Sequence, residues 1–125
     1  MANPNIVSVN SIFGNTTGIA LTTTLTTVLL ANGTSSGKVF KVNSIMIANV
    51  DGTNAADVTV DYHTAANGTA GSSFALAATI SVPADATLNL VDKNSSFYLM
   101  ENQSIIGGAS ADSDLECIIS YEEIS

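Results

Sequence analysis

The fold is decided by residues 38–63, which read K-V-F-K-V-N-S-I-M-I-A-N-V-D-G-T-N-A-A-D-V-T-V-D-Y-H. Two apolar segments are separated here by D-G-T-N at residues 51–54, a sequence typical of turns. The first segment is apolar on both faces at residues 45–47, I-M-I. A strand with one face in water alternates, whereas a strand covered on both faces need not. We therefore expect residues 39–50 to form a strand at the centre of a sheet.

The two faces of this strand divide its apolar side chains into two groups. The face that we expect to fill the core carries Phe40, Val42, Met46 and Val50. Ile45 and Ile47 fall on the other face, between Asn43 and Asn49. A small apolar patch with polar flanks suits a contact between subunits. Ile45 and Ile47 are therefore predicted to form a subunit interface.

Turn signals divide the rest of the chain into short segments, and the sequence predicts further strands at residues 6–13, 17–31, 57–63, 74–82, 87–91, 97–100, 104–107 and 115–121. Residues 14–15 and 32–37 are expected to form a turn and a loop. Leu21, Leu25 and Leu29 also fit the spacing of a helix, but the many threonines favour a strand, broken near residues 23–24.

Alternation predicts which side chains of two later strands face the core. The inward residues are expected to be Phe74, Leu76, Ala78, Ile80 and Val82 in one strand, and Leu115, Cys117, Ile119 and Tyr121 in the other. The pattern as a whole predicts one all-β domain over residues 1–125, a two-sheet sandwich or barrel with a short N-terminal arm at residues 1–5.

Composition narrows the classes of function. The chain has 125 residues, of which 46% are apolar and 11% charged, against roughly 25% charged in an average protein. Such a surface of small polar residues suits a β protein that is largely in contact with other subunits, or one that lives outside the cytosol. The net charge of -8 argues against binding to nucleic acid or to an anionic membrane. Neither a signal peptide nor a long apolar segment is evident, so we expect synthesis in a cytoplasm.

His63 is the single histidine, and it is the residue on which a catalytic or metal site would depend. With Asp57 and Asp61 it shares the expected outer face of one strand, but three ligands along one strand lie too far apart to converge on a metal. A Ser-His-Asp triad would need the same histidine, and no G-x-S-x-G motif accompanies it. We expect a solvated polar face here and no enzymatic activity.

Two other groups of residues have simple structural interpretations. Asp112, Asp114 and Glu116 alternate, but the calcium-loop pattern is absent, so they are expected to protect an edge strand from aggregation. Cys117 lies among apolar residues and is expected to be a buried small hydrophobe. No disulfide within the chain, no cofactor and no metal are expected.

Residues 97–125 read F-Y-L-M-E-N-Q-S-I-I-G-G-A-S-A-D-S-D-L-E-C-I-I-S-Y-E-E-I-S. This segment resembles the C-terminal end of small structural proteins of tailed bacteriophages, notably marine and cyanobacterial ones. Their pattern is an apolar pair, L-x-E-G-D-S-I, a small-residue loop and a strand ending in S-Y-E-E. Residues 42–60, V-N-S-I-M-I-A-N-V-D-G-T-N-A-A-D-V-T-V, also resemble them. The chain departs from the pattern at Asn102-Gln103, where those proteins have Gly-Asp.

The resemblance implies a jelly-roll-like β-sandwich of about eight to ten short strands that belongs to a virion. The leading expectation is a decoration (cement) protein, a homotrimer on the outer capsid surface that binds and stabilises the major capsid protein lattice. Capsid contacts are expected from Asn3, Pro4 and Asn5 and from the loops at residues 33–37 and 64–73. The alternative is a tail, neck or fibre component that binds a receptor or a glycan.

Overall fold

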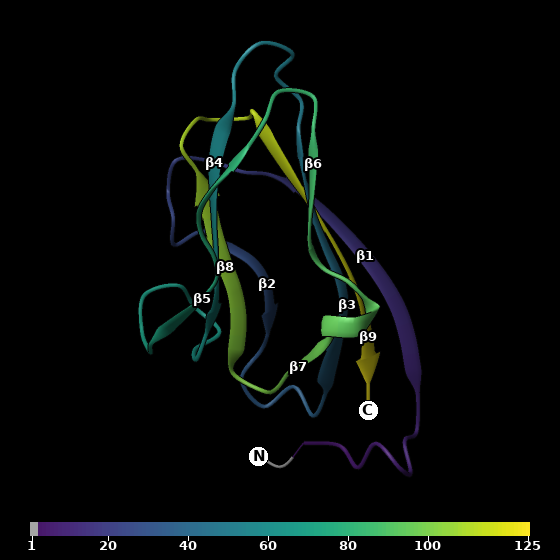
Figure 1. Ribbon diagram of the computed structural model, residues 1–125. Helices are drawn as coiled ribbons and strands as arrows, with labels where there is room; N and C mark the ends of the chain where they lie inside the picture. The colour runs from purple at the N-terminus through teal and green to yellow at the C-terminus, as the bar shows by residue number, and fades with distance from the viewer. Residues whose placement is uncertain (1–2) are drawn as a thin grey trace.

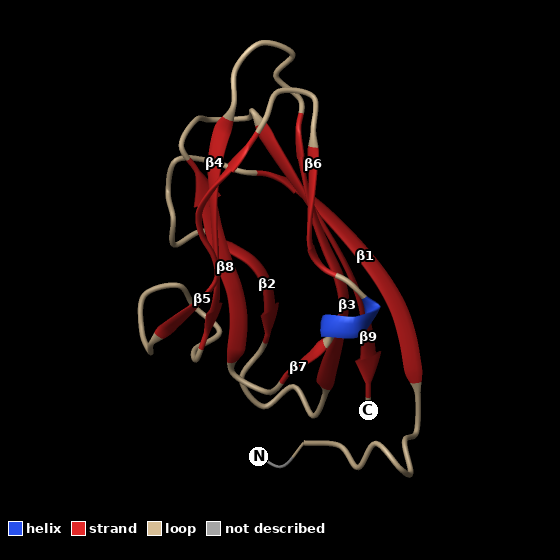
Figure 2. Cartoon of the chain, viewed as in Figure 1, coloured by secondary structure: helices blue, strands red, loops and turns tan. Residues whose placement is uncertain are grey.

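The computed structural model describes residues 3–125, which form nine β-strands and one short 3-10 helix, η1 (Lys93–Ser95). Figure 2 shows the strands in red and η1 in blue. In chain order the strands are β1 (Ile12–Ala20), β2 (Val28–Asn32), β3 (Val39–Asn49), β4 (Ala56–His63), β5 (Ser73–Val82), β6 (Thr87–Val91), β7 (Phe97–Leu99), β8 (Gln103–Ala109) and β9 (Leu115–Ile124). The predicted all-β class and number of strands are confirmed.

The strands form two antiparallel sheets that face each other (Figure 1). Sheet A has the order β1-β9-β3-β6, and the short β7 also pairs with β3. Sheet B has the order β2-β8-β4-β5. The predicted central strand is confirmed, because β3 has β9 on one side and both β6 and β7 on the other.

The pairing is nested, as in one long hairpin that has been rolled up. β4 pairs with β5, β3 with β6, β2 with β8 and β1 with β9. Two further pairs, β3 with β9 and β4 with β8, join these ribbons into the two sheets. This is the strand order of a jelly roll, in which eight strands form a double sheet. The predicted jelly-roll-like sandwich is therefore confirmed, with β7 as an additional short strand.

A β-bulge in β3 corrects the predicted division of its faces. Val42 pairs with Tyr121 and Ser44 with Ser120, so Asn43 is an extra residue with no partner on β9. One extra residue moves every later side chain of a strand to the opposite face. Phe40 and Val42 enter the core as predicted, but beyond the bulge the faces are exchanged.

The predicted subunit interface is consequently wrong. Ile45 and Ile47 are both 0% exposed and belong to the core between the sheets. Met46 and Val50, which were expected in the core, are instead 37% and 52% exposed. The other predicted inward face on sheet A is confirmed, because Leu115, Cys117 and Ile119 are fully buried and Tyr121 packs against the core.

The predicted inward face of β5 is wrong in large part. Phe74, Ala78 and Ile80 are exposed, whereas Val82 is buried and Leu76 packs partly against the core. The register of β5 against β4 shifts twice, between Ile80 and Ala77 and between Ala77 and Ala75. Each shift interrupts the alternation from which the face was predicted.

The N-terminal part of the chain also differs from the prediction. The strand expected at residues 6–13 begins only at Ile12, and the turn expected at residues 14–15 lies inside β1. Ile12 pairs with Ile124 at the end of β9, so residues farther toward the N-terminus have no strand opposite them. The predicted break near residues 23–24 is confirmed by the gap between β1 and β2.

The threonine-rich residues 22–27 in that gap lie against β8. The amides of Gly107 and Ala109 donate hydrogen bonds to the carbonyls of Thr27 and Thr22, at 2.9 and 2.8 Å. A Cβ atom on Gly108 would lie only 2.7 Å from the carbonyl oxygens of Thr22 and Thr24. The segment thus completes the backbone pairing of β8 beyond the end of β2, and the glycines permit its close approach.

Candidate assembly surface and aromatic groove

The outer face of sheet A is a candidate surface for assembly. Its three central rows, read from β1 across the sheet, are Thr16, Ser120 and Ser44; Gly18, Ile118, Met46 and Asn89; and Ala20, Glu116, Ala48 and Thr87. Met46 and Ile118 are neighbours at its centre and are 37% and 38% exposed. Among these described residues Glu116 carries the only charge. Small residues with few charges around an apolar centre are typical of the core of a protein interface.

The predicted capsid-contact residues Asn3, Pro4 and Asn5 lie at one end of this sheet. Asn3 and Asn5 are exposed, and Pro4 is half-buried. A pocket of about 230 Å³ is lined by Asn3, Pro4, Ile6, Val39, Tyr98 and Met100. The N-terminal segment therefore lies beside the first residue of β3 and the C-terminal end of β7. Met1 and Ala2, which complete the predicted arm, lie outside the described residues.

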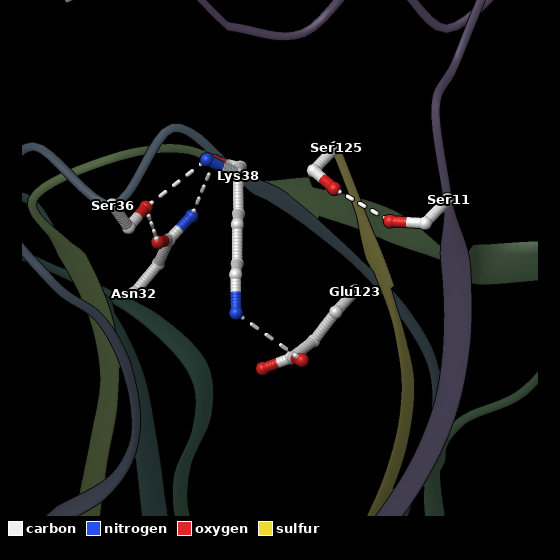
Figure 3. A network of polar contacts seen from close by, with 6 residues as sticks. All are labelled: Ser11, Asn32, Ser36, Lys38, Glu123 and Ser125. Carbon is white, nitrogen blue, oxygen red and sulfur yellow. Dashed lines mark hydrogen bonds and ion pairs between the residues drawn. The ribbon is translucent and has the colours of Figure 1, made fainter.

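The predicted contact loop at residues 33–37 is anchored by a buried asparagine (Figure 3). The Asn32 amide donates hydrogen bonds to the carbonyls of Lys38 and Leu99, at 2.9 and 3.0 Å. Its carbonyl oxygen accepts one from the Ser36 hydroxyl. An ion pair of 3.5 Å between Lys38 and Glu123 connects the end of the loop to β9. Asn32 thus holds both ends of the loop, a role that sequence alone did not indicate.

The segment before β1 meets Ser125 on the same side of the molecule as this loop. The hydroxyls of Ser11 and Ser125 are 2.7 Å apart (Figure 3). The amides of Asn10 and Ser11 also donate hydrogen bonds to the Ser125 carbonyl. The segment before β1 is thereby fixed to the end of β9.

A second buried asparagine, Asn49, has the corresponding role at the other end of β3. Its side-chain amide donates hydrogen bonds to the carbonyls of Val82 and Asn54, at 2.9 and 3.0 Å. Its carbonyl oxygen accepts a hydrogen bond of 2.9 Å from the Asp51 amide. Asn49 therefore joins β3, β5 and the turn after β3.

The predicted contact loop at residues 64–73 is held from beneath by His63. This corrects the expectation of a solvated face, because His63 is only 4% exposed. Its Nδ1 lies 2.9 Å from the Ser73 hydroxyl, and its Nε2 bonds the Ala70 carbonyl. A carbonyl only accepts, so Nε2 carries a proton. The Ser104 hydroxyl donates a further bond of 2.6 Å to the Ala65 carbonyl.

Next to this loop lies an open groove lined by aromatic side chains, which we call the aromatic groove. It has a volume of about 450 Å³ and is lined by Tyr62, Phe74, Ala75, Leu76, Ser95, Phe97 and Tyr98. The chain has four Phe and three Tyr, and four of these seven aromatic residues line this groove. The sequence alone does not indicate this groove, because residues from β4, β5 and β7 meet only in the folded chain.

The acidic and histidine side chains considered for a metal or catalytic site have other neighbours in the fold. Within residues 3–125 no cluster of three or more His, Cys, Asp or Glu side chains is placed to hold a metal ion. Asp112 accepts a hydrogen bond of 2.9 Å from the Thr23 amide and so fixes the loop before β9 to residues 22–27. The buried Glu101 carboxylate has no hydrogen-bond partner among the described residues.

Two titratable side chains in sheet A are shifted by burial. Desolvation raises the pKa of the Cys117 thiol to about 12, so this buried thiol is protonated and a poor nucleophile at neutral pH. Its predicted character as a small hydrophobe is confirmed by its 0% exposure. Burial, and to a lesser extent the Glu123 carboxylate, raise the pKa of Tyr121, whose ring packs 5.1 Å from that of Phe40.

Comparisons of the chain with protein-family models, curated proteins and solved structures find no match. Membership of the phage structural proteins therefore stays a prediction from the sequence. The described residues also contain no helix with the length and apolar character needed to span a membrane.

Proposed function

We propose that the protein is a structural component of a phage virion, a decoration protein that binds the outer surface of the major capsid protein lattice. The observation that supports this most is the outer face of sheet A, with Met46 and Ile118 at an almost uncharged centre. The resemblance of residues 42–60 and 97–125 to phage structural proteins supports the same function. The proposed homotrimer rests on that resemblance alone.

In this proposal the protein stabilises the capsid by bridging between neighbouring capsid subunits. The outer face of sheet A packs against sister copies, because burying Met46 and Ile118 there removes apolar surface from water without desolvating a row of charges. Residues 33–37 and Asn3, Pro4 and Asn5 lie at one end of the sandwich and contact the capsid. The anchors at Asn32 and Ser36 limit the freedom that this loop would lose on binding.

The test is electron cryo-microscopy of the virions that contain the protein. We expect density for the jelly roll at regular positions on the outer head lattice, with the end that carries residues 33–37 toward the capsid. Density on the tail, neck or fibres, with none on the head, would contradict the decoration function. It would support the second candidate, a receptor-binding component, for which the aromatic groove offers a binding site.

A further inference from the structure

We propose that the aromatic groove binds a neutral saccharide through stacking of a pyranose ring on its aromatic side chains. The groove lies between the first residues of β5, at the edge of sheet B, and η1 and β7 on the side of sheet A. The inference is independent of the decoration function, because it requires only that the groove faces solvent.

The groove has an apolar floor and exposed aromatic walls. Tyr62, Leu76 and Phe97 are partly buried and pack against the core, so they form the floor. Phe74 and Tyr98 are 59% and 44% exposed. The ring of Phe74 is stacked on that of Tyr62, with centroids 6.2 Å apart and an angle of 27° between the planes. Two large aromatic rings are thus held at the surface without being covered.

The chemistry of the lining favours a sugar ring. The face of an aromatic ring is negative, and the C–H groups on one face of a pyranose carry partial positive charge because their carbons bear oxygen. The phenol hydroxyls of Tyr62 and Tyr98 can both donate and accept hydrogen bonds with sugar hydroxyls. The lining contains no charged residue, so neither an anionic nor a cationic ligand would be matched there.

The size of the groove favours a small ligand over a folded protein. Its volume of about 450 Å³ lies within the range of small-molecule sites, roughly 300–1,000 Å³. Seven residues line it, whereas a stable protein interface involves about 20–30 residues on each side.

Hydrogen bonds hold the backbone segments on both sides of the groove. Phe74 directly follows Ser73, which bonds the buried His63. Ser95 belongs to η1, where its amide donates a bond of 3.1 Å to the Asp92 carbonyl and its hydroxyl accepts one from the Asp92 amide. A backbone that is already ordered loses less conformational freedom on binding than a mobile one.

The test is titration of the isotope-labelled protein, followed by nuclear magnetic resonance, with maltohexaose, cellohexaose and chitohexaose. We expect at least one of them to shift the amide signals of residues 73–76 and 95–98. Phe74→Ala and Tyr98→Ala should each weaken this binding by about fivefold to tenfold. Phe13→Ala is the matched control, because Phe13 is 62% exposed on β1 and does not line the groove.

The proposal is overturned if none of the three oligosaccharides binds, or if both groove variants bind as the wild type does. It is also overturned if hexaproline, a probe for proline-rich protein segments, shifts the groove signals and the sugars do not. Both variants alter exposed side chains, so each should stay folded, and the thermal unfolding midpoint should fall by no more than about 8 °C even where the Tyr62–Phe74 stacking is lost. A protein that binds none of the sugars can still occupy its sites on the capsid. The titration therefore tests sugar binding, and electron cryo-microscopy tests the decoration function separately.

Discussion

Asn43 determines which side chains of β3 enter the core. It has no partner on β9, so the alternation that runs through Phe40 and Val42 continues with Ile45 and Ile47. A sequence can indicate how apolar a strand is on each face, but a single extra residue exchanges the faces without changing the composition. The apolar character of residues 45–47 therefore predicted the central strand correctly and the subunit interface wrongly.

The exchanged faces predict opposite results for two neighbouring substitutions. Ile47→Lys places a charge in the core and should lower the free energy of unfolding by at least about 3 kcal/mol, enough to unfold a marginal domain. Met46→Lys, on the outer face, should lower it by less than about 1 kcal/mol, because a lysine there extends its charge into water. Urea unfolding followed by circular dichroism measures both. Equal losses in the two variants would contradict the bulge at Asn43.

Cys117 predicts a decline of stability at alkaline pH. Its pKa is raised from 9.0 to about 12 in the folded protein, so the unfolded chain loses the thiol proton first. The folded state then binds more protons, and stability falls as the pH rises from about 9 toward 12. At pH 10 the thiol should contribute a loss of about 1 kcal/mol relative to pH 7.

Urea midpoints at pH 7 and pH 10 measure this loss, and Cys117→Ala is the control. The variant is less stable at both values because it leaves a small cavity, but its decline should be smaller than that of the wild type. The raised pKa of Tyr121 adds to the decline in both proteins and cancels in the difference. An identical decline in both would contradict a titrating Cys117.

β8 is closely packed on both of its edges, with Gly108 against residues 22–27 and Gly107 against β4. A Cβ atom on Gly107 would lie 2.4 Å from the Thr59 carbonyl oxygen on β4, whereas one on Gly33 would meet nothing within 4 Å. Gly107→Ala should therefore lower the free energy of unfolding by about 1–3 kcal/mol through overpacking. Gly33→Ala should change it by less than about 0.5 kcal/mol. Thermal unfolding of the two variants, compared with the wild type, tests the close packing of β8.

Strand positions could be predicted from the sequence more reliably than strand faces. β6 was predicted with the bounds observed, and the bounds of β3, β4 and β7 differ by one residue from the prediction, because each is a compact apolar segment between turn residues. β5 was also located, but its two register shifts and the left-handed backbone of Thr79, with φ 53°, interrupt the expected alternation. Such irregularities depend on the partner strand, which the local sequence does not specify.

The candidate sites were harder to predict, since they depend on the topology of the whole sandwich. Tyr62, Phe74 and Phe97 are distant in sequence and meet because β4, β5 and β7 converge beside one opening. Asn32 was expected in a loop and Asn49 beside an exposed apolar patch of the central strand, yet both are buried. The loops at residues 33–37 and 64–73 could be located from the sequence. The buried residues that hold them, Asn32 and His63, could be identified only from the folded structure.

The proposed association surface predicts different behaviour for two equally exposed isoleucines. Ile118 on the outer face of sheet A and Ile80 on β5 in sheet B are each 38% exposed. Ile118→Lys should weaken self-association by about tenfold or more, because a charge would have to be desolvated between subunits. Ile80→Lys should leave it within about twofold of the wild type. Light scattering over a dilution series measures the change; association that tolerates Ile118→Lys would place the interface elsewhere.

The nested pairing has a consequence for how the chain reaches this structure. The innermost ribbon, β4 with β5, can close as soon as both strands exist, but β1 pairs only with β9, and Ile12 meets Ile124. During synthesis at about 5–20 residues per second, β1 waits until β9 has left the ribosome. Non-local pairs of this kind close slowly, and until then a strand carrying Ile12, Phe13 and Ile19 offers an open edge to other nascent chains. The hydrogen bonds between Ser11 and Ser125 continue the ribbon of β1 and β9, so they too can form only after β9 has been synthesised.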